Sequence, residues 1–190
     1  RAPTEADADR INDALEPLVR EAAAERARLI PGARETFEAL RDKGVRIGST
    51  TGYTRAMMGP ILAAAADQGY APELVVCAGE TKVGRPSPLM LWKVMVEFGV
   101  YPASAVVKVD DAPAGIAEGR SAGCFTVGVA ASGNALGLSL EDYRALPADG
   151  RAARLADAYA ALRAAGADLV IDSVADLIPA LRTDGRVRLG

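Results

Sequence analysis

The stretch Val45-Arg46-Ile47-Gly48-Ser49-Thr50-Thr51-Gly52-Tyr53-Thr54 runs from an apolar segment straight into hydroxyl groups and a glycine. Where a strand ends and a helix begins, free backbone N–H groups and hydroxyls gather, and such a turn can bind phosphate. Serine and threonine are also ordinary helix caps. By itself, the stretch therefore allows either a phosphate site or a simple cap.

Short apolar runs and helical patterns alternate on both sides of this stretch. Buried strands are brief apolar runs bounded by turn residues, whereas helices repeat apolar residues every three or four positions. We expect strands at residues 45–49, 74–77, 106–109, 125–130 and 168–171. We expect helices at residues 4–29, 33–43, 54–68, 88–98, 114–122, 151–165 and 174–182.

This alternation predicts an α/β fold, a Rossmann-like parallel sheet with helices on both faces. The strands are almost wholly apolar, which suits a sheet that is covered on both sides. Thr4 is the expected N-cap of the first helix. Residues 132–150 are polar and irregular, and we expect a loop there.

The composition argues against several classes of function. Half of the 190 residues are apolar and 25% are charged, so the chain can form a real core. A net charge of -3 gives no electrostatic reason to bind nucleic acid or an anionic membrane. No apolar run approaches the roughly 20 residues of a membrane span, so a cytoplasmic location is the expectation.

Histidine is absent from the chain. This excludes Ser-His-Asp and Cys-His catalysis within these residues and argues against zinc. Cys77 and Cys124 each lie in an apolar run, and we expect both to be buried thiols. Any catalysis must therefore use carboxylates, hydroxyls, lysine, arginine or a hard metal ion.

Polar groups follow three of the expected strands, at residues 50–53, 80–86 and 110–111. In an open parallel sheet, ligands bind beyond the carboxyl ends of the strands. Arg85 lies in the second group, between Gly84 and Pro86, where a guanidinium can orient phosphate oxygens. The alternative is a solvated surface arginine. Lys82, in a loop expected to be wet, and Lys108, expected to point away, rank below Arg85.

Asp110 and Asp111 end an apolar run. Adjacent carboxylates repel unless they are solvated, protonated or share a cation, and Mg²⁺ binds through one or two carboxylates while it keeps several waters. Because successive strand residues point oppositely, one carboxylate is expected to be a direct ligand and the other to orient it. The alternative is that the pair caps the helix that begins near Pro113.

A strand-end threonine, a loop arginine and a strand-end aspartate pair, in this order, resemble motifs of the haloacid dehalogenase superfamily. The match is closer to the phosphonoacetaldehyde hydrolase family and runs over most of the chain. It consists of Gly48-Ser49-Thr50-Thr51-Gly52-Tyr53-Thr54-Arg55, Gly84-Arg85-Pro86, Gly99-Val100-Tyr101-Pro102 and Lys108-Val109-Asp110-Asp111. Its specific features are an arginine in place of the superfamily's usual lysine and the Gly-Tyr after the threonine.

The resemblance implies hydrolysis of the carbon–phosphorus bond of a small phosphonate, phosphonoacetaldehyde, to acetaldehyde and phosphate. In that family a cap-domain lysine forms a Schiff base with the aldehyde, and an aspartate on the first core strand attacks phosphorus. Water then hydrolyses the aspartyl phosphate, while Mg²⁺ and the arginine stabilise the transferring group. The resemblance also implies a homodimer.

By motif matching, the resemblance assigns Thr51 as the phosphate ligand, with Thr50 as the alternative in the neighbouring register. Arg85 is expected to clamp the phosphate. Gly52 and Tyr53 are expected to line the pocket.

The same matching assigns Asp111 as the Mg²⁺ ligand. The family often carries a further acid four residues later, and that position is Gly115 in this sequence. Asp110 is therefore expected to substitute for that acid near the metal.

The front of the chain departs from the family pattern. No apolar strand ending in an aspartate precedes Thr51, and no lysine precedes Lys43. By the resemblance, residues 1–28 are a remnant of a helical cap and residues 29–190 are the α/β core without its first strand. That strand lies between those carrying Thr51 and Asp111, so we expect a gap in the sheet and a fragment that is inactive alone.

Two alternatives remain open from the sequence. One is a phosphatase or phosphoglucomutase-like member of the same superfamily, which shares the core and differs in the cap. The other is a non-catalytic module that binds phosphate with Mg²⁺ and turns nothing over.

Overall fold

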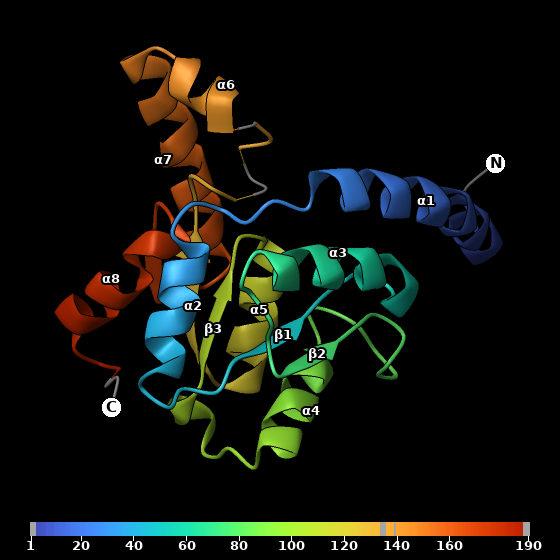
Figure 1. The fold of residues 1–190 in the computed structure, drawn as a ribbon, viewed down its shortest axis with the longest axis horizontal. Coiled ribbons are helices and arrows are strands. Elements are labelled where there is room, and N and C mark those ends of the chain that lie inside the picture. The colour runs from blue at the N-terminus through green and yellow to red at the C-terminus, as the bar shows by residue number, and fades with distance from the viewer. Residues whose placement is uncertain (1–2, 134–135, 139, 188–190) are drawn as a thin grey trace.

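A computed structural model describes residues 3–133, 136–138 and 140–187 of the chain (Figure 1). The strands are β1 (Gly48–Thr50), β2 (Leu74–Val76), β3 (Val107–Asp110), β4 (Phe125–Val129) and β5 (Leu169–Ile171). The α-helices are α1 (Glu5–Arg26), α2 (Ala33–Arg41), α3 (Arg55–Asp67), α4 (Leu89–Phe98), α5 (Pro113–Ala122), α6 (Leu140–Ala145), α7 (Ala148–Ala164) and α8 (Leu177–Asp184). Short 3-10 helices occupy Ala103–Ala105 and Val174–Asp176.

The strands are parallel, but they form two separate sheets. One holds β1 and β2, and the other has the order β3-β4-β5. The sheets meet along a seam between β1 and β3, where the Lys108 amino group of β3 reaches the Thr50 hydroxyl of β1. The predicted α/β fold with parallel strands is confirmed. In the described residues no backbone pairing joins β1 to β3, as the expected gap requires.

Helices cover both faces of the first sheet, because the side chains of β2 point alternately toward α3 and toward α4. Val75, with the adjoining Cys77, packs against Met58 of α3. Val76, between them, packs on the opposite side against Met90 of α4. Successive strand residues point to opposite faces, so an all-apolar strand needs a helix on each side.

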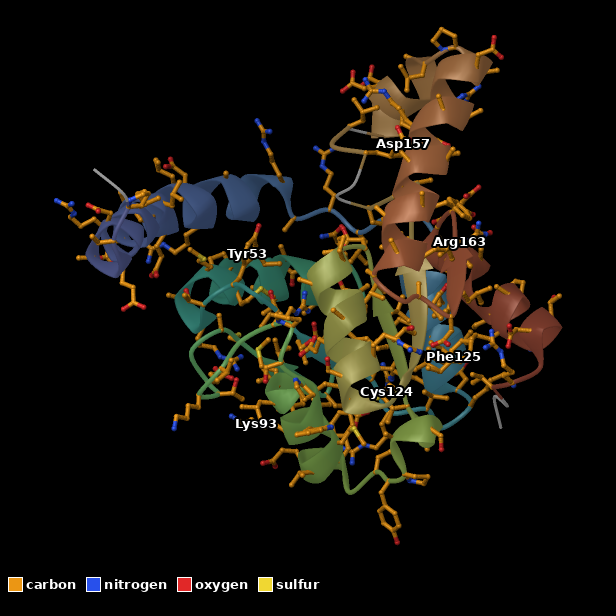
Figure 2. The ribbon with its side chains drawn as sticks, turned by 180° about the vertical axis from the view of Figure 1, so that it is seen from behind. Tyr53, Lys93, Cys124, Phe125, Asp157 and Arg163 are labelled. Carbon is orange, nitrogen blue, oxygen red and sulfur yellow. The ribbon has the colours of Figure 1, made fainter. Side chains whose placement is uncertain are left out.

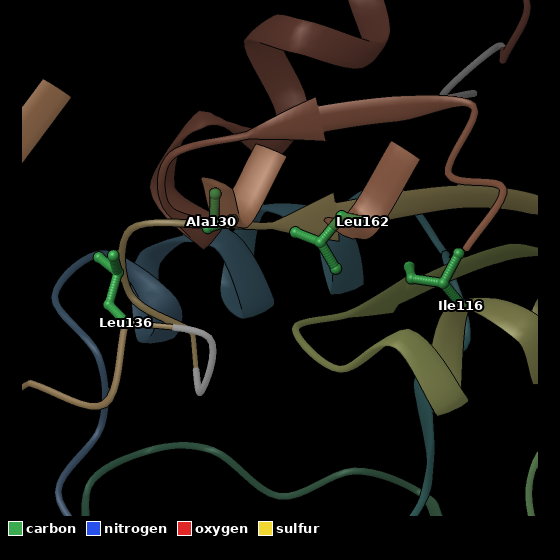
Figure 3. Packing of buried hydrophobic residues seen from close by; sticks show 5 residues of the cluster. Ile116, Ala130, Leu136 and Leu162 are labelled. Atoms are coloured by element: carbon green, nitrogen blue, oxygen red, sulfur yellow. The ribbon is translucent and has the colours of Figure 1, made fainter. Parts of the chain in front are cut away.

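The second sheet is covered in the same way. Val107 and Val109 of β3 lie in a cluster with Leu177 and Leu181 of α8. On the other face α5, α7 and the segment after β4 form a separate cluster through Ile116, Ala130, Leu136, Ala158 and Leu162 (Figure 3). Because the alternate residues of β3 leave the α8 side, Lys108 and Asp110 face α5.

Several element boundaries differ from those expected. Residues 132–150 are not one loop, because α6 lies within them and α7 begins at Ala148; residues 134–135 and 139 are outside the described residues. Pro147 suggests a break, yet it precedes the first helical turn, where a missing N–H costs nothing. The strand expected from Val45 begins at Gly48, because Glu73 takes the Ile47 N–H with its side chain.

α1 packs along α3, and an extended segment leads from it to α2 (Figure 1). Thr4 is its N-cap, as expected. The Leu29 N–H donates to Gln68 Oε1 (2.9 Å), and Gln68 Nε2 donates to the Ala27 carbonyl (2.6 Å). A domain boundary near residue 28 stays a prediction. Within the described ranges, no helix has the length and apolar character that a membrane span requires.

Candidate active site

Four charged side chains meet at the seam between β1 and β3. Arg85 comes from the loop between β2 and α4, Lys108 and Asp110 come from β3, and Glu118 comes from α5. The carboxyl ends of parallel strands lie at one edge, so residues that are distant in sequence converge there. Arg85 and Asp110, which the sequence places at this edge, are in contact.

Each cation contacts both carboxylates. Arg85 Nη2 lies 3.2 Å from Asp110 Oδ2, and Arg85 Nε lies 3.1 Å from Glu118 Oε2. Lys108 Nζ lies 3.1 Å from the same Asp110 oxygen and 2.9 Å from the same Glu118 oxygen. We call these four residues the charge ring. The ring holds two cations and two carboxylates in alternation, so its formal charges sum to zero.

The charge ring is shielded from water. Its Glu118 side chain is fully buried, those of Lys108 and Asp110 are 8% exposed, and that of Arg85 is 17% exposed. Buried ions lose several kcal/mol of hydration each, so they persist only with good partners. Removal of a single member would leave an uncompensated charge in the interior.

The Thr50 hydroxyl lies inside the charge ring. It accepts hydrogen bonds from Lys108 Nζ (2.7 Å) and Arg85 Nη2 (3.1 Å), and it donates to Glu118 Oε2 (2.8 Å). Arg85 also donates to the Thr50 carbonyl. A hydroxyl has one donor and two acceptor positions. Those of Thr50 are all used by the protein itself.

The residues after Thr50 lie outside the charge ring. The Thr51 hydroxyl accepts from the Tyr53 N–H (3.1 Å), and among the described residues its own O–H has no acceptor. Gly52 and Tyr53 are exposed, and Tyr53 lies just before α3 (Figure 2). Thr54 is the N-cap of α3, because its hydroxyl accepts from the Met57 N–H. Of the hydroxyls in this stretch, Thr54 thus serves as the cap.

Asp110 fills space that a side chain at position 115 would need. A Cβ on Gly115 would lie 2.0 Å from Asp110 Oδ2. The other Asp110 oxygen, Oδ1, accepts from the Ala112 N–H (3.0 Å). The N-cap of α5 is Ala112, which has no side-chain capping bond. The alternative that the aspartate pair supplies the N-cap of this helix is therefore wrong.

Asp111 follows Asp110 and is partly buried. A Cβ on Gly133 would lie 2.6 Å from the Asp111 Cβ, so the loop after β4 closes against this residue. The described residues contain no group of three or more histidine, cysteine, aspartate or glutamate side chains that could hold a metal. The partly buried Asp111 carboxylate is nevertheless a ligand of the type that Mg²⁺ accepts together with water and phosphate oxygens.

Cys77 and Cys124 are buried free thiols, as predicted. Burial raises the pKa of both thiols. A raised pKa lowers the fraction of reactive thiolate at neutral pH. Neither cysteine therefore suits nucleophilic catalysis.

Comparison with known proteins shows the family to which the chain belongs. Residues 1–123 match the family model of haloacid dehalogenase-like hydrolases. Phosphonoacetaldehyde hydrolases of Paraburkholderia phytofirmans and Paraburkholderia xenovorans are 48% and 47% identical to the chain over 178 residues. The chain belongs to the phosphonoacetaldehyde hydrolase family. These alignments cover 94% of this chain and 67% of each relative, so the chain spans about two thirds of their length.

A solved structure within this family has nearly the same fold. The crystal structure of a phosphonoacetaldehyde hydrolase like protein from Oleispira antarctica matches with a TM-score of 0.93 and 43% identity. The match covers 98% of this chain and 67% of that chain. A putative β-phosphoglucomutase from Thermotoga maritima, at 20% identity and a TM-score of 0.60, shares the fold alone.

In this member of the phosphonoacetaldehyde hydrolase family, sequence reasoning did not predict that Lys108 and Glu118 belong to the charge ring. From the sequence we expect Lys108 to point away from the edge and to matter less than Arg85. The structure instead places Lys108 beside Asp110 on the α5 face. Glu118 is not singled out by any motif. The sequence does hold a signal that could have identified Glu118. It lies on a helix face of otherwise small or apolar residues, Gly115, Ile116, Gly119 and Ala122, and a carboxylate buried there needs charged or polar partners.

Proposed function

We propose that this protein hydrolyses the carbon–phosphorus bond of phosphonoacetaldehyde to acetaldehyde and phosphate, as part of phosphonate catabolism. The relatives named for this reaction support the proposal. The observation that carries it is Arg85, the arginine in place of the superfamily's usual lysine, which Thr50 and two carboxylates hold at the carboxyl end of β1. A fixed guanidinium at that edge suits a phosphoryl group, whose transfer depends on positioning and charge stabilisation.

Phosphate is proposed to bind between Arg85 and the turn before α3. The Thr50 hydroxyl is already occupied by the charge ring, so we assign Thr51 as the phosphate ligand and Thr50 as a support for Arg85. Gly52 and Tyr53 are proposed to line the pocket. A Cβ at Gly52 would meet no atom within 4 Å, which leaves open space above the turn.

Mg²⁺ is the metal ion that we propose for this site, held by Asp111 with water. Asp110 is proposed to orient these ligands from the space beside Gly115. It would replace the acid that the family often carries at that position, four residues after the metal-binding aspartate. When bound, the ion would neutralise charge on the phosphoryl oxygens. Arg85 would supply fixed N–H groups that donate to the phosphoryl oxygens.

A strand between β1 and β3 is proposed to complete the site. These strands share no backbone pairing in the described residues, and their facing edges need hydrogen-bond partners. We propose that the family's aspartate nucleophile lies on such a strand and that the imine-forming lysine belongs to a cap domain. The aspartate attacks phosphorus, and the electrons of the C–P bond pass to the carbon as an enamine. Protonation and hydrolysis of the imine then release acetaldehyde, and water releases phosphate.

The test measures both products with the complete protein. Acetaldehyde is followed by NADH oxidation with alcohol dehydrogenase, and phosphate is followed by molybdate colour. Equal amounts of both are expected, and Arg85→Lys should lower the rate about a hundredfold because it removes the forked donor from the phosphoryl group. Arg34→Lys, at an exposed pair with Glu38 on α2, is the matched control.

Borohydride separates the proposal from the phosphatase alternative. The imine mechanism predicts inactivation by borohydride only while substrate is present, because the imine is what borohydride reduces. Phosphate released from simple phosphate esters without acetaldehyde from the phosphonate would establish the phosphatase instead. Phosphate binding with neither activity would establish the non-catalytic module. Homodimerisation and a cytoplasmic location stay predictions.

A further inference from the structure

Glu118 is fully buried in the middle of α5, and no step of the proposed reaction uses it. One of its oxygens, Oε2, contacts Thr50, Arg85 and Lys108. The other, Oε1, is buried and has no hydrogen-bond partner among the described residues. A buried charge with an unsatisfied oxygen is a costly way to fill a core, and apolar residues of similar volume often stabilise more. Packing alone therefore does not account for an acid at this position.

The two carboxylates of the charge ring occupy different positions. Asp110 lies at the end of β3, is 8% exposed and bonds to the N–H of the following turn. Glu118 lies on the interior side, against Arg85 Nε and beneath the Thr50 hydroxyl. An anion that reaches Arg85 from the strand ends meets Asp110 first. Glu118 can keep its contacts with Arg85 and Lys108 while the anion takes the place of Asp110 at Arg85.

The local packing holds Glu118 in register with the cations. Gly119 lets α5 approach β3 closely, because a Cβ there would lie 2.7 Å from Lys108 Cγ. This approach brings Glu118 Oε2 to within 2.9 Å of Lys108 Nζ. Arg85 Nε, at 3.1 Å, makes an ion pair with Glu118 although its N–H is not aimed at the oxygen.

We propose that Glu118 is the positioning residue of the phosphate site: it holds Arg85 and Lys108 against Thr50 and offsets one of their two positive charges. The proposal rests on the proposed function for the identity of the anion. Without Glu118 the ring would carry one net positive charge in a poorly hydrated place, where Coulomb attraction is strong. Phosphate would then bind more tightly, while the arginine would lose its fixed direction.

Calorimetric titration with inorganic phosphate, in the presence of Mg²⁺, tests this directly. Glu118→Gln keeps the shape of the side chain and removes its charge, so we expect phosphate to bind about tenfold more tightly. Turnover should fall about tenfold or more, because a small misplacement of a positioned group is costly. Glu73→Gln is the matched control, since Glu73 pairs with Arg46 at an exposed site and should leave both quantities unchanged.

A second pair of variants covers the case in which the single change does not fold. Lys108→Met should weaken phosphate binding about tenfold by removing a cation. The Glu118→Gln, Lys108→Met double variant removes one charge of each sign and keeps the ring neutral. It should bind phosphate about tenfold more tightly than Lys108→Met alone.

Tighter binding in each background that folds supports the inference. Unchanged or weaker binding in either folded background overturns it, and so does failure of the neutral double variant to fold, because Glu118 would then be a folding requirement. Complete wild-type protein, with the strand and cap domain proposed above, that binds phosphate but releases no acetaldehyde would refute the proposed reaction alone. Wild-type protein that binds no phosphate would refute both.

Discussion

At position 115 only a hydrogen atom fits between α5 and the Asp110 carboxylate. A Cβ there would lie 2.0 Å from Asp110 Oδ2. We expect Gly115→Ala to push Asp110 out of the charge ring and to lower the free energy of unfolding by about 1–3 kcal/mol, the usual cost of overpacking. The loss should appear even though alanine favours a helix interior by about 1 kcal/mol. Urea unfolding measures it.

Gly59, on α3, provides the matched control for Gly115. A Cβ there would meet no atom within 4 Å, and the residue also lies inside a helix. Gly59→Ala should therefore raise the free energy of unfolding by about 0.5–1 kcal/mol. Equal effects at both positions would mean that the contact with Asp110 carries no energetic weight.

The two neighbouring threonines should respond differently to loss of the hydroxyl. Thr50→Val removes the hydroxyl that accepts from Lys108 and donates to Glu118 inside the buried charge ring, so we expect a loss of about 1–3 kcal/mol in the free energy of unfolding. Thr51→Val should leave stability nearly unchanged and lower turnover about a hundredfold, since we propose that its O–H faces the phosphate. Thermal unfolding and the acetaldehyde assay separate the two effects. The opposite pattern would reverse the assignment.

At the scale of elements, a side-chain hydrogen bond joins α7 to the residue that follows β5. Tyr159 donates to Asp172 Oδ1 (2.7 Å), and burial together with this bond raises the pKa of Tyr159 from 10.0 to about 12. Unfolded tyrosine ionises first, so this contribution to stability is complete below pH 10 and is lost as the pH rises through about 12.

We therefore expect Tyr159→Phe to flatten the fall in melting temperature between pH 10 and about 12. Phenylalanine cannot ionise, so it does not favour the unfolded chain in this range. Tyr101→Phe, at a site that is 86% exposed, is the control and should keep the wild-type slope. Identical slopes for all three proteins would remove Tyr159 as the cause.

The Gln68 side chain bonds to the segment between α1 and α2. Gln68 binds the Ala27 carbonyl and the Leu29 N–H from the end of α3. Gln68→Ala should leave both backbone groups without these bonds and free the segment to open locally. Trypsin should then cleave after Arg26 or Arg28 several-fold faster, whereas Asp67→Ala should not change the rate. Unaltered cleavage would show that packing of α1 on α3 is sufficient.

At the scale of the whole molecule, β1 and β3 face each other across the seam without backbone pairing in the described residues. Unpaired strand edges are open to pairing with another strand. We expect the chain to bind phosphate with Mg²⁺ and to release no acetaldehyde, and we expect turnover when an aspartate-bearing strand and a cap are joined before residue 1. Both proteins are assayed side by side. Comparable acetaldehyde release by the two would contradict the proposed role of the seam.

Local patterns were sufficient for much of this molecule. Apolar runs such as Leu74–Val76 must be covered on both faces, and Gly99 and Gly123 end helices with the left-handed backbone that glycine adopts easily. The regular alternation of these elements predicts a parallel α/β fold. The expectation of a loop over residues 132–150 was wrong, because α6 and the start of α7 lie within those bounds.

The sequence by itself determined the fold class and the placement of Arg85 and Asp110 at the edge where the strands end, because parallel strands bring their carboxyl ends together. Only the tertiary structure decided that Glu118 and Lys108 join them and that the Thr50 hydroxyl is used inside the ring. The physical reason is that partner choice among buried charges depends on distances across the seam. Those distances are set by how closely α5 packs on β3, and no local pattern encodes that approach.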